Sequence, residues 1–152
     1  MSTLADSVCL ALTALWQGAT SATLTGVVVA DGPQADSDPS PDLLYVAYNG
    51  EPDSGALIVD ATQNLMAFAK VKGEDASVTC SILSSTGEPN VVSARSRAFA
   101  VLAAAEDLLR ADMQLGGLVM QAYVSSHQYY PSQTTSGAVA RVVFTVTYKA
   151  QL

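Results

Sequence analysis

The stretch 90–117 constrains the fold most, because it predicts one long helix from residue 91 to about residue 112. Asn90 is placed to cap the first turn, and Gly116-Gly117 follows the end. The interior of the helix contains no Pro or Gly, and alanine is its commonest residue, which favours helix locally. At about 1.5 Å per residue the helix would span roughly 33 Å, the width of a small domain. Its apolar face is predicted from helical spacing: Ala94, Ala98, Val101, Leu102, Ala105, Leu108 and Leu109.

The opposite side of this helix is half alanine, and that pattern has two interpretations. Alanine favours helix by itself, and small residues also allow another element to approach closely. The sequence leaves open whether this side reflects helix propensity alone or is a packing face for the N-terminal helix or for another copy of the protein. The side comprises Ser93, Arg97, Ala100, Ala104, Asp107 and Ala111.

The remaining segments predict a sheet that the helices cover. A first helix is expected over 4–17, with Thr3 and Asp6 at the spacing of a capping box. Strands are expected over 24–30, 43–48, 56–59, 65–71, 77–84, 118–128 and 138–150, the last two joined by a hairpin with a polar tip. The expected fold is a single α+β domain over 1–152. Its sheet is a largely antiparallel mixed one, covered on one face by the N-terminal helix and the central helix 91–112.

Strict alternation assigns faces to the last two strands. In 118–128 one face is expected to carry Leu118, Met120, Ala122 and Val124, and the other Gln121, Tyr123, Ser125 and His127. In 138–150 the inward residues are expected to be Ala140, Val142, Phe144, Val146 and Tyr148. The predicted core between helix and sheet is centred on Val101, Leu102, Leu108 and Phe144.

Composition and charge exclude several classes of protein. Charged residues make up only 14% of the chain, against a usual value of about 25%. Either part of the surface is covered by other subunits, or the surface is rich in Ser, Thr, Gln and Asn. The net charge of −7 argues against binding along a nucleic-acid backbone. No apolar run approaches the ~20 residues of a membrane span.

The sequence carries no pattern that predicts catalysis. His127 is the single histidine, and we expect an exposed structural role for it. Cys9 and Cys80 are expected to be buried thiols of a protein made in a reducing cytoplasm. The aspartates of 31–42 lack the spacing of a Ca²⁺ loop, which favours a solvated loop. We therefore expect no enzyme activity, no metal and no cofactor.

Over its whole length the chain resembles the tail terminator (tail completion) proteins of long-tailed bacteriophages, especially those that infect actinobacteria. The resemblance rests on the order and spacing of several features. They are the N-terminal helix, Asp31-Gly32-Pro33, Tyr48-Asn49-Gly50-Glu51-Pro52, the strand 78–83 running into Ser84-Ser85-Thr86-Gly87, the helix with Ala94-Arg95 and Arg97-Ala98, and the closing strand 140–146.

The resemblance implies a structural role in the virion without catalysis. Such proteins form a ring, usually a homohexamer, on the head-proximal end of the tail tube. The ring stops tube polymerisation and joins the tail to the head-side connector. The implied partners are other copies of the chain, the major tail tube protein and a connector or stopper protein, while viral DNA passes through the lumen without specific binding. The alternatives are another neck, head–tail connector or tube-like ring protein, a small enzyme, and a monomeric binding module.

Two segments are candidates for contacts with a neighbouring subunit or the tube. One is the polar loop 31–42, with Asp36, Asp38 and Asp42. The other is the tip of the last hairpin, where tyrosines can bury apolar area and still offer a hydroxyl. Its candidate residues are Tyr129, Tyr130, Pro131, Gln133 and Thr134.

Overall fold

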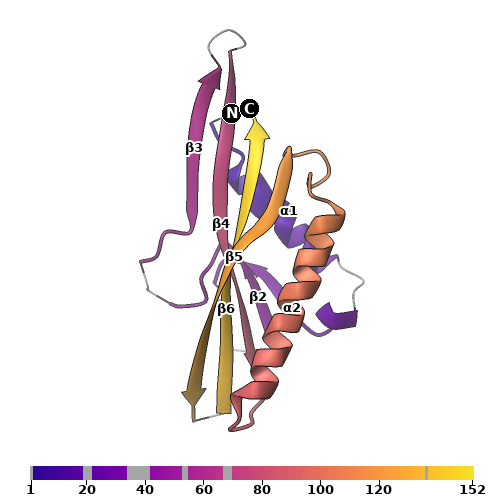
Figure 1. The fold of residues 1–152 in the computed structure, drawn as a ribbon, viewed down its shortest axis with the longest axis vertical. Helices are drawn as coiled ribbons and strands as arrows, with labels where there is room; N and C mark the ends of the chain where they lie inside the picture. Colours follow the sequence, from indigo (N-terminus) through magenta and orange to yellow (C-terminus); the bar gives the residue numbers. More distant parts are fainter. Residues whose placement is uncertain (1, 19–21, 34–41, 53–54, 67–69, 136) are drawn as a thin grey trace.

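The computed structural model describes residues 2–18, 22–33, 42–52, 55–66, 70–135 and 137–152. These residues form two helices, a short 3₁₀ turn and one six-stranded sheet (Figure 1). The elements, in chain order, are α1 (Ala5–Gln17), η1 (Ala22–Leu24), β1 (Val28–Asp31), β2 (Asp42–Val46), β3 (Val59–Met66), β4 (Val71–Ser85), α2 (Val91–Ala111), β5 (Gln121–Thr134) and β6 (Gly137–Gln151).

Strand β4 is the strand from which the sheet is built outward. Its 15 residues pair antiparallel with β6 along one edge, from Gly73 to Ser85. Along the other edge β4 changes partner, pairing with β3 over its first half and with β2 near its end. β5 extends the sheet beyond β6, and β1 lies parallel to β2 at the opposite side. The predicted α+β fold with a largely antiparallel mixed sheet is confirmed.

The core lies between this sheet and the two helices, and Trp16 joins its layers. The Trp16 ring meets the Phe144 ring of β6 edge-on, with 5.9 Å between centroids. Its indole Nε1 donates a hydrogen bond of 3.1 Å to the carbonyl oxygen of Ala105, in the middle of α2. Both needs of an indole are therefore met inside the core, apolar contact and a partner for its N–H. The expected inward residues of β6 are all fully buried: Ala140, Val142, Phe144, Val146 and Tyr148.

Helix α2 begins and packs largely as its sequence predicts. Asn90 accepts a hydrogen bond of 2.9 Å from the backbone N–H of Val92, which caps the first turn. The apolar face is buried except at Leu108, which is only partly buried, so its place in the predicted core is wrong. Leu109, one residue on, is 1% exposed and takes the central position. The helix ends at Ala111, and Gly116-Gly117 lies in the turns that follow.

Helix α1 starts differently from the predicted capping box. Its N-cap is Leu4, and Thr3 Oγ1 accepts a hydrogen bond only from the N–H of Ala5, at 3.2 Å. The N–H of Leu4 instead donates to the carboxylate of Glu74, at 3.1 Å. The backbone N–H at the start of α1 is therefore satisfied by Glu74, a buried acid far away in the sequence, and not by the predicted capping box of Thr3 and Asp6.

Four strand predictions are wrong in their limits. The segment 24–30 forms η1 and only the short strand β1, because Gly26 turns the chain with φ 80°. The expected strands 56–59 and 65–71 are replaced by a continuous hairpin of β3 with the first half of β4. The expected strand 118–128 begins later and runs to Thr134, so the predicted polar hairpin tip is mostly strand.

A β-bulge in β5 reverses the faces of its second half. Val124 pairs with Val146 and Ser126 with Thr145, which leaves Ser125 without a partner in the ladder. One extra residue shifts the alternation, so His127 lies on the helix-facing side, not on the predicted polar face. The His127 ring packs edge-on against Phe99 of α2, with 5.9 Å between centroids.

Replacing Leu109 by alanine should destabilise the protein by about 2–5 kcal/mol, because it leaves a cavity in the rigid core between α2 and the sheet. Leu108→Ala is the matched control, since the same atoms are removed from a partly buried site, and we expect a loss of about 1 kcal/mol. Urea unfolding of both variants measures the difference. Equal losses would contradict this assignment of the buried face.

Candidate functional site

The predicted interface residues of the 31–42 loop fall into two groups. Asp36 and Asp38 lie outside the described residues. Asp42 is the first residue of β2, and its carboxylate lies 3.0 Å from Nε of Arg97 of α2. Its other oxygen accepts a hydrogen bond of 2.7 Å from Ser84. This contact fastens the start of β2 to α2 and β4.

The predicted interface residues near the last hairpin belong to strand β5. Tyr129 faces α2, where its ring packs edge-on against Phe99 with 5.7 Å between centroids. Tyr130 faces the opposite side of the sheet and is 46% exposed. Pro131, Gln133 and Thr134 follow on β5 and are exposed. The two tyrosines, adjacent in sequence, therefore serve different surfaces.

On the helix-free face, Tyr130 forms part of a shallow pocket. The guanidinium of Arg141 lies 4.4 Å from the centroid of the Tyr130 ring, a cation–π contact. Arg141 also donates a hydrogen bond of 2.8 Å to the carbonyl of Asn49, and lies 3.7 Å from the carboxylate of Glu51. The pocket has a volume of about 390 Å³. It is lined by Gly50, Glu51, Pro52, Leu83, Tyr130, Pro131, Ser132, Val139 and Arg141.

The hairpin of β3 (Val59–Met66) with Val71–Val78 of β4 extends from the rest of the sheet, and we call it the arm (Figure 1). From Asp60 to Met66, β3 is exposed at every residue. The last two pairs, Leu65 with Lys72 and Met66 with Val71, lie beyond Gly73, where the ladder with β6 ends. Leu65 is 69% exposed and Met66 55% exposed, and because successive residues of a strand point to opposite faces, each face of the arm carries one of these large apolar side chains near its end.

The arm was not predicted from the sequence. A strand exposed on both faces carries no apolar alternation, so β3 has no period-two pattern by which it could be recognised. The usable signal was the pair Leu65-Met66 next to Lys70 and Lys72 in a chain with few basic residues.

The base of the arm is fixed by the buried carboxylate of Glu74. Glu74 is 1% exposed and accepts hydrogen bonds of 2.6 Å from the Tyr148 hydroxyl and 2.7 Å from Nε2 of Gln63. It also accepts the N–H of Leu4, at the start of α1, where the helix dipole favours a negative charge. One carboxylate thus ties together β3, β4, β6 and α1.

These contacts set the protonation of Glu74. Burial by itself would raise the pKa, but hydrogen bonds from Tyr148, Gln63, Thr3 and the Leu4 N–H outweigh it and hold the pKa of Glu74 below its ordinary value of 4.5. Burial, together with the Glu74 carboxylate, raises the pKa of Tyr148, which therefore stays a donor. The group is a stable anion at neutral pH.

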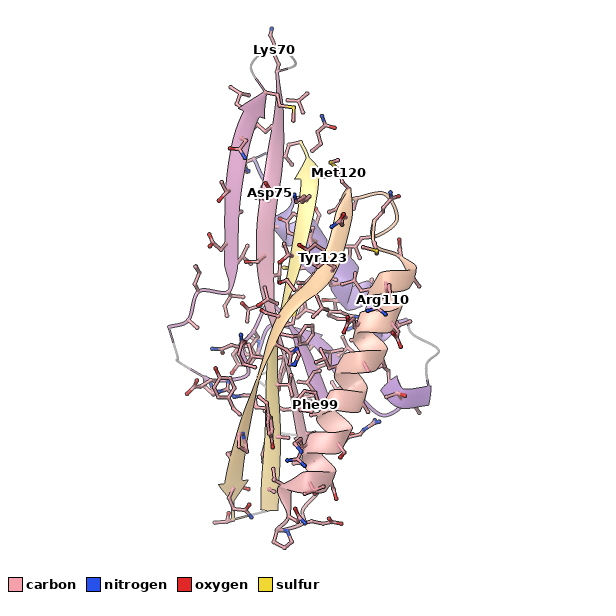
Figure 2. The ribbon with its side chains drawn as sticks, in the orientation of Figure 1. Lys70, Asp75, Phe99, Arg110, Met120 and Tyr123 are labelled. Carbon is pink, nitrogen blue, oxygen red and sulfur yellow. The ribbon has the colours of Figure 1, made fainter. Side chains whose placement is uncertain are left out.

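A groove lies between the C-terminal half of α2 and the start of β5. It has a volume of about 380 Å³ and is lined by Glu106, Leu109, Arg110, Met113, Ala122, Tyr123 and Val124. Figure 2 shows Arg110 on α2 and Tyr123 on the neighbouring β5 at this position. Met120, just before β5, is 63% exposed. The groove thus presents an apolar floor with a charged rim on the α2 side.

The alanine-rich side of α2 is partly occupied. The turn η1 contacts α2, and Thr23 lines a hollow of about 450 Å³ together with Leu108 and the alanines at 100, 103, 104 and 111. Helix α1 reaches α2 on its other side, through Trp16. That this side of α2 is a packing face for another copy stays a prediction.

The described part of the chain offers no assembled chemistry. Within it, no group of three or more His, Cys, Asp or Glu side chains is arranged to hold a metal ion. Nor does any helix there have the length and apolar character needed to cross a membrane. Burial raises the pKa of Cys9 to about 11 and that of Cys80 to about 12, so both thiols are protonated and unreactive at neutral pH.

The comparisons with known proteins give a likeness of fold. No protein-family model matches the chain, and no curated protein matches it by sequence. Among solved structures, it is similar to a chain from the virion of a native gene transfer agent particle. The TM-score is 0.62 at 11% sequence identity, and the match covers 100% of both chains. At that identity the similarity shows a shared fold.

We expect Glu74→Gln to destabilise the protein at pH 7 by about 1–3 kcal/mol, because an amide offers one acceptor oxygen and turns an NH₂ group toward buried donors. A carboxylate with a lowered folded pKa adds stability that is present above its unfolded pKa of about 4.5 and is lost as the pH falls through the folded pKa. The variant should therefore lose less of its melting temperature between pH 7 and pH 3 than the unsubstituted protein does.

Asp75→Asn is the matched control, since it removes the same charge from the exposed neighbour of Glu74. Thermal melts followed by circular dichroism at both pH values measure the effect. An acid-dependent loss that is the same in all three proteins would show that Glu74 does not stabilise the fold as an anion.

Proposed function

We propose that this chain acts, as one α+β unit, as a structural protein of a phage-like virion. More finely, we propose that it forms a homomeric ring, of six copies, at the head-proximal end of the tail tube. The ring would stop tube polymerisation and join the tail to the head-side connector. No catalytic step and no cofactor belong to this role.

The observation that carries the proposal is the fold similarity over the full length of both chains to a chain of a virion particle. The resemblance of the sequence to tail terminator proteins points to the same kind of particle. The exposed arm adds independent support, because large apolar side chains on a projecting hairpin favour an assembly that covers them. So does the low charge content of 14%.

The molecule presents different surfaces at its two ends, as a junction protein needs. The arm lies at one end of the long axis, and the end of β5 and the start of β6 lie at the other, beside the start of α2 (Figure 1). There the N–H of Ala138 donates to the carbonyl of Glu88, at 2.8 Å. We propose that the exposed residues Pro131, Gln133 and Thr134, with Tyr130, Asp36, Asp38 and the first residue of β2, Asp42, contact the tube, the connector or a neighbouring subunit.

Removing this protein in an infection should give tails of abnormal length, or tails that fail to join heads, while head and tube proteins are still made. Electron microscopy of the particles measures tail length and joining, and restoring the gene is the control. A labelled copy should be found only at the neck. Normal joined tails without the protein would overturn the proposal, and label along the whole tube would replace the terminator role with that of a tube protein.

A further inference from the structure

We propose that the tip of the arm of one copy packs into the groove between α2 and β5 of a second copy. The inference rests on the proposed ring and deepens it, by assigning the two patches through which successive subunits meet. The arm contributes Leu65 and Met66, with Lys70 and Lys72 beside them. The groove contributes Leu109, Met113 and Tyr123, with Glu106 on its rim.

The arm has the character of a surface that is covered in the assembly. Leu65 and Met66 lie beyond the support of β6, and β3 is exposed throughout its residues 60–66. The base, in contrast, is held rigidly by Glu74 and its donors on three other elements. Because Leu65 and Met66 lie on a strand that is paired with β4, their backbone loses little conformational freedom on docking, so more of the contact energy remains for association.

The groove offers what such a tip requires. Its floor is apolar, formed by Leu109 and Met113 with Ala122 and Val124 of β5, and Tyr123 borders it. Tyr123 is 37% exposed, and Met120, just before β5, is a further exposed apolar side chain at 63% (Figure 2). Aromatic and methionine side chains such as these are enriched at protein interfaces.

The arm cannot fill the groove of its own chain. Strand β3 and strand β5 lie on opposite edges of one sheet, with β4 and β6 between them. Adjacent strands are about 4.8 Å apart, so the three spacings from β3 to β5 amount to roughly 14 Å. Hydrogen bonds to β4 and β6 hold the two strands at that separation. The contact therefore joins different copies, and it is heterologous, which is the type of contact that closes a ring.

Charge selects a second copy as the occupant. The chain has three lysines, and two of them, Lys70 and Lys72, lie at the end of the arm. Neither forms an ion pair with the described residues. The groove itself is lined by Glu106 and Arg110, which pair at 2.9 Å, but the end of α2 beside it also carries Asp107 and Asp112, so three carboxylates stand against one guanidinium. The basic end of the arm and this acidic end of α2 are complementary between copies.

Cysteine cross-linking tests the contact directly. In the variant Leu65→Cys with Tyr123→Cys, a short bismaleimide should join successive chains into a ladder, both in concentrated protein and in particles that contain it. Leu57→Cys with Tyr123→Cys is the control, because Leu57 is as exposed, at 72%, but lies outside the arm. We expect about tenfold more cross-linked product from the arm variant, because docking raises the local concentration of the two thiols. The native thiols are buried and will not compete.

Charge reversal supplies a second readout. Lys70→Glu with Lys72→Glu should lower the cross-linking yield at low salt, and adding Glu106→Lys should restore part of it. Lys149→Glu reverses the remaining lysine, on β6 outside the arm, and should leave the yield unchanged, whereas either arm lysine reversed singly should lower it. A reduction that Lys149→Glu reproduces, or that Glu106→Lys does not relieve, would count against the contact.

The outcomes separate this inference from the proposed function. A ladder in solution from a protein that is absent from the neck would support the contact and overturn the virion role. A protein located at the neck whose arm cross-links to a different protein would leave the virion role standing and overturn the contact. Yields equal to the Leu57 control in both settings would also overturn it.

Discussion

The structure depends on the antiparallel pairing of β4 with β6. Both strands have 15 residues, and a continuous ladder joins them from Gly73 to Ser85. In the C-terminal half of β4, Val78, Cys80 and Ile82 point into the core. Its N-terminal half is one of the two strands of the arm. Because one strand belongs to both parts, the arm inherits the rigidity of the core. A separate hairpin of two strands would be only marginally stable in water.

Two buried polar side chains, Trp16 and Glu74, attach the helices to the sheet. Trp16 joins α1, α2 and β6, and its N–H finds a partner on the α2 backbone. Glu74 does the same at the arm end, where it collects donors from α1, β3 and β6. Each group is buried, so leaving its partners unpaired would cost far more than the bond gains. These hydrogen bonds fix the position of α1 on the sheet more narrowly than apolar packing does, because hydrogen bonds are directional.

The sequence predicted those elements whose residues meet one environment all along their length. Strand β6 alternates strictly, and α2 repeats with helical spacing, so both were found nearly in full. Strand β3 was missed because neither of its faces is buried. Leu108 and Leu109 are neighbours on one helix face, and only the sheet decides which lies deeper. Of the candidate contact residues, Tyr129 and Tyr130 were found by their type. Their opposite directions follow from the alternation of the strand, and the bulge decides that Tyr129 is the one that faces α2.

The bulge at Ser125 also determines where strand β5 can change in length during evolution. Before it, the even-numbered residues of β5 face the helices, as Ala122 and Val124 do; after it, the odd-numbered residues do, as His127 and Tyr129 do. Two phases therefore coexist in one strand, and Ser125 is where they meet. Loss of Ser125 would remove the bulge and leave both halves of β5 facing as they do, whereas a residue lost elsewhere in β5 would turn a buried face outward. Among related chains, differences in the length of this strand should gather at the bulge, and alignments that place a gap elsewhere in it will pair residues that face opposite sides.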